Sequence, residues 1–476
     1  MTKLPQRTPG TAPPGTADGA PAAMAGRGPR FLVLICCSSV FMVSLDSTIV
    51  NVALPSIHAD FAASATDLQW VVDSYTITLA CFLILSGSSG DRFGRRRVFR
   101  VGLVLFCVGS LVCSLAPSPG ALALARIPQA IGGSMLNPVA MAIIVNEFTD
   151  RRVRAKVVGV WGSVVGLSMA VGPLLGGLVV GLSGWRGVFW INVPIALVVL
   201  VSTRVLPESR GTRVKAPDPV GELLVIAFLL ALVVGLMNPE SAAPFPIQML
   251  LILSVGIGVL LIAWELHHRD PLIDPRLFGI PAFSVAIVSA VLGFAALSGF
   301  LFLNSLYLQN VRGLTAIEAG LALLPMAINA CLAPVWSGAL VAKFGPPLPL
   351  VLSGLGLATA GIVIGTVDSP ALWLLGVAYA AFGCGFGMIN PPITTTVVSV
   401  VPSTQSGLAS AIVSTGRQAG AAAGVAILGS RLPDLLSQGA AESLLQRQWL
   451  IAAAGALIIL GALVGTPKRA EGVRDA

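Results

Sequence analysis

Two ionisable side chains of opposite charge, Asp46 and Arg126, lie inside apolar segments of this 476-residue chain. Asp46 lies in the later part of the first segment, and Arg126 near the beginning of the fourth. Segments that cross a membrane in alternating directions would place both side chains at a similar depth, in its outer half. A buried carboxylate and a buried guanidinium offset each other's desolvation, whereas either alone is costly. A carboxylate whose basic partner moves away can bind a proton, so both residues are candidates for proton coupling.

Asp73, in the second apolar segment, lies near the same depth and is a third candidate for proton coupling. Two structural interpretations stay open beside this one. Asp46 can be a buried acid whose hydrogen bonds come from Ser47, Thr48 or Asn51, and Asp73 can lie among lipid headgroups. The elements that carry these residues decide which interpretation holds.

The composition requires those elements to be membrane helices. Hydrophobic residues make up 55% of the chain and charged residues 11%, whereas a soluble protein carries about a quarter charged residues. The apolar runs are about twenty residues long and lack strict alternation, which is typical of membrane helices and not of barrel strands. We predict an all-α polytopic membrane protein with fourteen spans, at 31–53, 68–89, 98–117, 121–145, 156–180, 187–206, 219–237, 246–266, 281–303, 317–341, 347–367, 370–392, 406–430 and 448–465.

Basic residues concentrate in alternate loops of this arrangement. The N-terminal tail, the loops on its side of the membrane and the C-terminal tail hold 23 of the 29 Lys and Arg residues. Cytoplasmic loops carry such an excess, so we predict a multi-pass protein of the cytoplasmic membrane with both termini in the cytoplasm. Residues 1–30, rich in Pro, Gly and Ala, are predicted to be a disordered tail, and residues 466–476 a second tail. Because the loops account for the net charge of +8, nucleic acid is not an expected partner.

A glycine-rich basic turn, G-S-S-G-D-R-F-G-R-R-R at 87–97, joins the second and third spans. Its glycines permit close helix approach and positive φ in a sharp reversal, and its single acid can pair with the arginines or cap a helix N-terminus. The simpler interpretation is a solvated loop that only sets orientation. The order of glycines and charges favours a conformational role, carried by Gly87, Gly90, Asp91, Arg92, Gly94, Arg95 and Arg96.

Two short patterns occur twice in the chain. M-x-N-P occurs at 135–138 and again at 388–391, and the basic turn has a partial copy at 338–345, with Lys343, Phe344 and Gly345 in place of Arg92, Phe93 and Gly94. Since both patterns repeat at nearly the same offset, we predict two duplicated six-helix halves, 31–206 and 281–465, with two inserted helices at 219–266. Such duplications place the substrate near the midplane, between the halves.

The fifth span carries small residues at three- and four-residue spacing, which allow helices to approach closely. Proline removes a backbone hydrogen bond and bends a helix, so the sequence predicts a kink at Gly172-Pro173. An ordinary helix contact is the alternative. The residues expected to form this face are Gly166, Gly172, Pro173, Gly176 and Gly177.

These patterns together resemble the major facilitator superfamily, and within it the 14-span drug:proton antiporters, over roughly residues 31–465. The basic turn resembles the signature loop between spans 2 and 3, and L-D-S-T-I-V-N-V-A-L-P at 45–55 resembles the span 1 signature. Residues 122–134 resemble the span 4 signature, from which Pro128 and Ala130 depart. G-L-S-M-A-V-G-P-L-L-G-G at 166–177 resembles the antiporter signature of span 5.

The resemblance implies proton-coupled export of hydrophobic drugs or antibiotics, cations among them, and resistance to those compounds. It implies no cofactor, because a proton gradient drives the cycle. The expected partners are a small-molecule substrate, protons and the lipid bilayer, and the chain is expected to act as a monomer. We place the substrate near Asp46, Asn51, Gln129, Asn137 and Asn390.

Two other functions compete with export. A facilitator that imports a small metabolite is disfavoured by the span 5 pattern and by the scarcity of polar residues in the spans. A membrane-embedded enzyme is more remote, since the sequence has no phosphate-binding loop, no Ser/His/Asp arrangement and no cluster with metal-ligand spacing. We therefore expect no enzymatic activity and no metal.

Overall fold

The structure, a computed structural model, describes residues 29–148, 151–210, 218–237, 247–268, 271, 275–367, 370–400, 406–429 and 446–465. These residues form helices joined by short connections, with no β-strand among them. The all-α prediction is confirmed. The two predicted tails lie almost entirely outside the described residues, which omit 1–28 and 466–476. Pro29 and Arg30, the last residues of the first tail, are described and belong to the first helix.

The first half of the chain contains six α-helices and one 3₁₀ turn: α1 (Pro29–Phe61), α2 (Ala65–Phe93), α3 (Arg95–Ser114), α4 (Pro119–Glu147), α5 (Arg151–Trp190), α6 (Asn192–Ser202) and η1 (Thr203–Val205). Two helices follow, α7 (Pro219–Met237) and α8 (Ile247–His267). The remainder comprises η2 (Pro275–Gly279), α9 (Pro281–Leu306), η3 (Tyr307–Val311), α10 (Ala316–Ala322), α11 (Leu324–Phe344), α12 (Pro347–Thr366), α13 (Leu372–Val400), α14 (Ser406–Gly429) and α16 (Trp449–Gly465).

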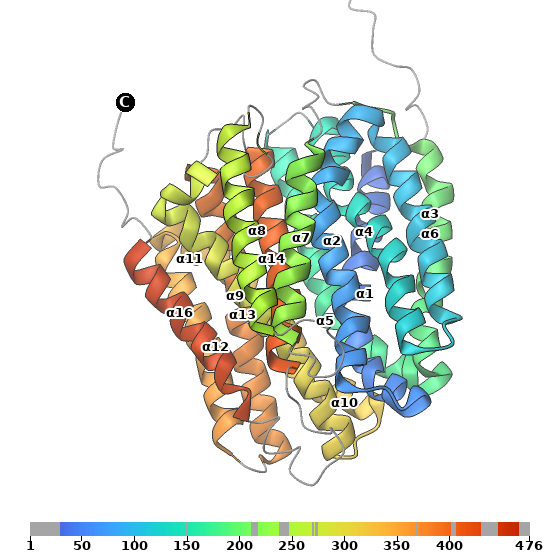
Figure 1. The fold of residues 1–476 in the computed structure, drawn as a ribbon, viewed down its shortest axis with the longest axis vertical. Helices are drawn as coiled ribbons and strands as arrows, with labels where there is room; N and C mark the ends of the chain where they lie inside the picture. The colour runs from blue at the N-terminus through green and yellow to red at the C-terminus, as the bar shows by residue number, and fades with distance from the viewer. Residues whose placement is uncertain are drawn as a thin grey trace, which may run out of the picture.

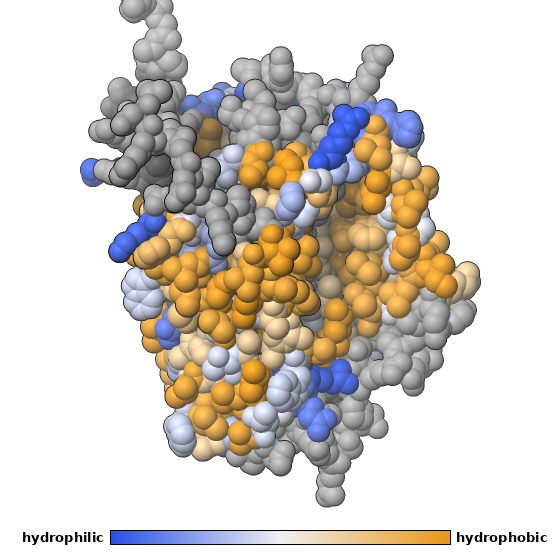
Figure 2. Space-filling model, turned by 90° about the vertical axis from the view of Figure 1, so that its left-hand side faces the viewer, coloured by the Kyte–Doolittle hydropathy of each residue, from blue (hydrophilic) through white to orange (hydrophobic). Residues whose placement is uncertain are grey.

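The helices correspond to the predicted spans, with two differences in their boundaries. Helix α5 contains the fifth predicted span and the first residues of the sixth, with a kink at Gly184, where φ is 71°, and the rest of the sixth span lies in α6 and η1. The tenth predicted span is divided between α10 and α11. Ten helical stretches in the described part of the chain are long and apolar enough to cross a membrane. Figure 2 shows the apolar band that such a protein needs, with hydrophilic residues toward the two ends of the molecule.

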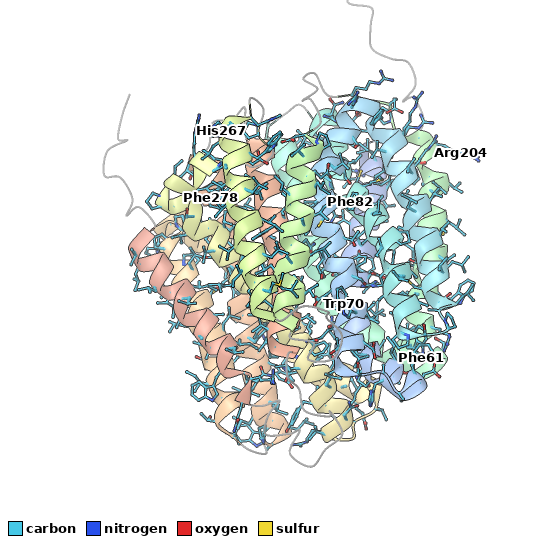
Figure 3. The ribbon with its side chains drawn as sticks, in the orientation of Figure 1. Phe61, Trp70, Phe82, Arg204, His267 and Phe278 are labelled. Carbon is cyan, nitrogen blue, oxygen red and sulfur yellow. The ribbon has the colours of Figure 1, made fainter. Side chains whose placement is uncertain are left out.

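Helices α7 and α8 pack against each other, and α7 also contacts α2 and α14 (Figure 1). In the first half α1 packs on α5, and α4 packs on both α2 and α3. In the second half α9 packs on α14, α11 on α13, and α12 on α16. Arg204 and His267 lie at one end of the bundle and Phe61 at the other (Figure 3). We call the end that carries Arg204 the basic end and the other the distal end.

The basic turn is more compact than the predicted loop, because α2 continues to Phe93 and α3 begins at Arg95. Gly94 alone separates them, with φ 105°, and its N–H donates to the carbonyl of Gly90 at 3.1 Å. Gly345, in the partial copy, also has positive φ (82°) and donates to the carbonyl of Val341 at 2.9 Å. The duplication therefore extends to backbone conformation, and a residue with a Cβ would be strained at either position.

The arginines of the turn hold the segment that follows α6. Arg96 donates from its side chain to the carbonyl of Leu206 at 3.2 Å and from its backbone to Glu208 at 3.2 Å. Arg100 donates to the hydroxyl of Thr203 at 2.8 Å, and Arg95 donates to the carbonyl of Ala142, in α4, at 3.1 Å. The turn thus fastens α3 to α4 and α6 inside one half.

Other residues of the predicted turn have separate places. A Cβ on Gly90 would lie 3.0 Å from Val139, and one on Gly87 would lie 3.8 Å from Pro138, so both glycines face α4. Arg92 is exposed, with its guanidinium 5.4 Å from the ring centre of Phe93. The side chain of Asp91 lies outside the described part of the structure, so its predicted pairing stays a prediction.

Glycines of α5 bring this helix into contact with both halves of the chain. A Cβ on Gly172 would meet Thr48, and one on Gly176 would lie 3.0 Å from Ile49, both in α1. A Cβ on Gly177 would likewise clash with the carbonyl oxygen of Ala316, at the start of α10 in the second half. Non-helical backbone angles inside α5 occur at Gly184, and the predicted kink at Gly172-Pro173 stays a prediction. The surroundings of Gly166 lie outside the described residues.

Two hydrophobic clusters join the halves. The larger combines, toward the distal end, first-half residues such as Ile57 and Phe189 with second-half residues such as Phe300, and the smaller joins Cys81 of α2 to Ala422 of α14. A further cluster, toward the basic end, contains first-half residues only, Leu32 and Phe99 among them. Two polar contacts reinforce the distal junction: Gln69 donates to the carbonyl of Val425 at 3.2 Å, and Gln309 to that of Val52 at 3.1 Å.

Candidate functional site

A cluster of buried polar side chains lies inside the first half. Asp46 comes from α1, Ser110 from α3, Arg126 and Gln129 from α4, and Asn192 from the first residue of α6. None of the five exposes more than 1% of its surface. Four helices therefore direct polar groups to one place in an otherwise apolar interior, which is costly unless the groups satisfy one another.

The centre of the cluster is an ion pair between Arg126 and Asp46. Nη1 of Arg126 lies 2.5 Å from Oδ2 of Asp46 and 2.9 Å from Oε1 of Gln129. Nε donates to the carbonyl of Val71 in α2 at 3.2 Å. The guanidinium also stacks on the ring of Tyr75, with 4.1 Å from Cζ to the ring centre. Cation–π contact and hydrogen bonds together stabilise the buried positive charge.

The second carboxylate oxygen of Asp46 accepts two amide donors. Gln129 Nε2 lies 2.9 Å and Asn192 Nδ2 2.7 Å from Oδ1. Gln129 Nε2 is also 2.9 Å from the hydroxyl of Ser110. Three N–H donors, one of them cationic, thus occupy both oxygens of the carboxylate. These donors come from α4 and α6, so the position of Asp46 depends on how α1 packs against those two helices.

The local sequence explains how α4 presents its two site residues. Arg126 and Gln129 are three residues apart, so their side chains leave the same face of the helix. Pro128, a departure from the span 4 pattern, does not interrupt α4, which is helical from Pro119 to Glu147. Gly109 in α3 allows close packing at this point, because a Cβ there would lie 2.6 Å from the backbone of Gln129.

Asp73, the third predicted proton-coupling residue, is not part of this cluster. It is fully buried in α2, so the headgroup interpretation is wrong. Its Oδ1 lies 3.5 Å from the hydroxyl of Thr76, and its Oδ2 has no hydrogen-bond partner in the described part of the structure. No described ion pair or hydrogen bond joins it to Asp46 or Arg126.

Of the five residues predicted to contact substrate, the structure brings together only Asp46 and Gln129. Asn51 is buried one turn along α1, where its Nδ2 lies 3.3 Å from the carbonyl of Ser47. Asn137 and Asn390, the repeated asparagines of α4 and α13, are partly exposed. The Oδ1 atoms of Asn51, Asn137 and Asn390 are buried without a partner among the described residues.

Sequence reasoning missed three members of the site. Asn192 is the lone amide in an apolar run that begins at Val188, which is a signal of the kind that identified Asp46. Ser110 and Tyr75 had no such signal, because small hydroxyls and tyrosines are common in membrane helices. Their role appears only when α2 and α3 are placed beside α4.

The second half contains an aromatic counterpart of the cluster. At the 253-residue offset between Met135 and Met388, Arg126 corresponds to Tyr379 and Gln129 to Phe382. Both rings pack on Phe300 of α9, at centre-to-centre distances of 5.2 Å and 3.9 Å. The hydroxyl of Tyr379 donates to Asn304 at 2.8 Å. In the described residues, aromatic rings thus occupy in the second half the positions of Arg126 and Gln129.

Two helical halves, a buried ion pair in one of them and an apolar exterior define a polytopic membrane transporter. The sequence profile of the Major Facilitator Superfamily matches residues 36–425, and the chain belongs to that family. D-xylose–proton symporter, a solved structure, has a TM-score of 0.67 at 15% identity, with 92% of this chain and 98% of that chain covered. An inward-facing bacterial homologue of the lysosomal transporter Spinster has a TM-score of 0.64 at 18% identity, with coverages of 92% and 97%.

Three curated relatives are similar over most of the chain. Multidrug resistance protein Stp of Mycobacterium tuberculosis is 35% identical, over 86% of this chain and 77% of the relative. The tetracenomycin C resistance and export protein of Streptomyces glaucescens is 32% identical, over 91% and 82%. The puromycin resistance protein pur8 of Streptomyces alboniger is 34% identical, over 86% and 83%.

Proposed function

We propose that this chain exports hydrophobic compounds, drugs or antibiotics among them, across the cytoplasmic membrane in exchange for protons, and so confers resistance. The names of the relatives support export. The observation that carries proton coupling is the buried pair of Asp46 and Arg126, with 0% and 1% of their side-chain surfaces exposed. Intramembrane ionisable residues are retained mainly for function.

The proposed cycle alternates between two states of this pair. In the first state Asp46 is ionised and held by Arg126, Gln129 and Asn192. When α1 moves relative to α4, Asp46 loses its donors, binds a proton and releases it after the return movement. The close packing of α1 on α5 through Gly172 and Gly176 is the contact along which such a movement can be transmitted.

The charge distribution supports an orientation for this cycle. Arg95, Arg96, Arg100 and Arg204 gather at the basic end, which we assign to the cytoplasm with both termini. With this assignment the junction between the halves at the distal end lies on the outer side, as expected for an inward-facing state. We further propose that a single chain performs the cycle without chemical conversion of the substrate.

Uptake of a metabolite is the second candidate function. The observation in its favour is the likeness to a sugar–proton symporter, but at 15% identity that likeness concerns the fold alone. The relatives that share about a third of this sequence have names of resistance and export proteins. Export is therefore the better supported direction.

Transport by the purified protein in liposomes tests the proposal. With an imposed pH gradient, ethidium should move against its concentration gradient while protons move in the opposite direction, followed by a pH-sensitive dye. A protonophore should abolish both movements, and liposomes without protein are the baseline. Ethidium movement that does not depend on the pH gradient would contradict proton coupling. Movement of ethidium and protons in the same direction would contradict export and support uptake.

A further inference from the structure

Arg417, in the middle of α14 (Ser406–Gly429), is a second arginine inside the membrane-spanning bundle. Its guanidinium carbon lies 5.6 Å from the ring centre of Phe294, in α9. Its Nε is buried and has no hydrogen-bond partner among the described residues. Unlike Arg126, which has an acid, an amide and a carbonyl, this guanidinium therefore meets only an aromatic ring in the described structure.

The sequences of α9, α13 and α14 contain neither Asp nor Glu. Helices α2 and α7, which also pack on α14, carry Asp73 and Glu222. Among the described residues no ion pair joins either acid to Arg417, and Asp46 is bound to Arg126. A cation in an apolar interior without a counter-charge is costly, and one retained there marks a functional site.

The packing of α14 directs Arg417 toward the interior. Gly416 and Gly420 face α9 at Ile287 and Val291, and Ala422 and Ala426 face α2 and α7. Residues advance about 100° along a helix, so Arg417 leaves α14 between its contacts with α9 and α2.

Phe294 lies on the corresponding sector of α9. Its neighbour Gly293 faces Ile389 of α13, Val291 faces α14, and Val285, on the opposite side, lies beside Gly461 of α16. The ring of Phe294 meets that of Phe386, in α13, at 5.3 Å in a T-shaped contact. Arg417 and Phe294 both keep part of their surface exposed.

We propose that Arg417, Phe294 and Phe386 form a subsite for the acidic group of an aromatic substrate, a carboxylate or phenolate attached to a planar ring. A guanidinium binds such anions with two parallel hydrogen bonds, and the two rings supply faces and edges for stacking. Asn390 follows Phe386 by one turn of α13, and its buried Oδ1 is unpartnered in the described residues. Its amide adds a group that can bind a substrate oxygen.

This subsite deepens the proposed function, on which it rests, and it changes the expected substrate class. The sequence favours lipophilic cations as substrates, because acids within the apolar spans can pair with a positive charge. In the structure the carboxylate of Asp46 is already neutralised, whereas the guanidinium of Arg417 is not. Electrostatics at this point therefore favours an anion.

Binding of a matched pair of probes to the full-length protein in nanodiscs tests the subsite. The probes are coumarin-3-carboxylate and its neutral carboxamide, followed by fluorescence anisotropy at neutral pH. R417Q should weaken carboxylate binding about tenfold or more, since a charge-assisted hydrogen bond is lost, and change carboxamide binding less than about twofold. R417K should lie between, and K343Q, which removes an exposed cation, should match the unmodified protein.

Equal losses for both probes in R417Q and R417K would overturn the proposal and make Arg417 a structural residue. So would a carboxylate bound no more tightly than its amide by the unmodified protein, or carboxylate binding that R417Q leaves unchanged. Export of ethidium by R417Q under a pH gradient separates this result from the proposed function. If the unmodified protein exports no ethidium while the probe result holds, proton-coupled export fails and the anion subsite stands.

Discussion

Gln129 and Asn192 donate to the same oxygen of Asp46, at 2.9 Å and 2.7 Å, while Arg126 occupies the other oxygen. The two amides come from different helices, α4 and α6. Asp46 is therefore fixed in position by more than its ion pair, and a displacement of either helix changes the environment of the carboxylate. Neutral amides offer a way to tune that environment without altering charge.

Replacement of Asn192 by leucine should lower the rate of pH-driven export. The change removes one of the two amide donors to Asp46, so the carboxylate is held less firmly and the maximal rate should fall severalfold. Export of ethidium from liposomes under an imposed pH gradient measures the loss. S202A, on the exposed side of α6, is the matched control. An unchanged rate would show that Asn192 only packs.

Replacement of Asp46 by asparagine keeps the size of the side chain and removes its titration. The variant should bind substrate and lose export driven by a pH gradient, while exchange of substrate for substrate survives. D46E, which extends the side chain by one methylene, should retain partial activity with a shifted pH optimum. D60N, an exposed acid at the end of the same helix, serves as control. If D46N exports neutral compounds normally under a pH gradient, another residue must carry the proton, and Asp73 is the next candidate.

Replacement of Gly177 by leucine should separate the halves at the distal end. The contact with the carbonyl of Ala316 leaves no room for a side chain, so the state seen here should be destabilised and export reduced about tenfold or more. Labelling rates of single cysteines introduced at the two ends report the change of state. G256L, in α8, is the control, because a Cβ there would meet no atom within 4 Å. If labelling and export are both unaltered, the contact of Gly177 with Ala316 does not hold the halves together at the distal end.

Replacement of Gly94 by alanine should damage the basic turn in two ways. Positive φ costs about 1 kcal/mol or more for a residue with a Cβ, and the new atom would lie 2.6 Å from Glu208. We expect lower thermal stability and slower export, measured by unfolding in detergent and by the liposome assay. G338A, where no atom lies within 4 Å of the new Cβ, should be nearly neutral. Equal behaviour of the two variants would contradict the proposed strain.

Hydrophobic pattern predicted the helices because membrane spans of about twenty residues leave few alternatives. The pairing of Asp46 with Arg126 was predicted from one property, the similar depth of the two residues in the membrane. Other features depend on contacts that no local pattern encodes. Gly94 as the single residue between α2 and α3 results from its hydrogen bond to Gly90 and packing on Glu208. The replacement of Arg126 by Tyr379 in the second half becomes meaningful only when Phe300 is seen beside it.

The aromatic rings at the positions of Arg126 and Gln129 in the second half have an electrical consequence. With Asp46 as the single carrier, one proton enters for each substrate that leaves. For a monovalent cation no net charge crosses the membrane, so the pH difference alone limits accumulation to about tenfold per pH unit. For a monovalent anion two positive charges move inward in effect, and the membrane potential adds about 4.6 kcal/mol per 100 mV. The charge of the substrate would thus decide whether the cycle is silent or electrogenic.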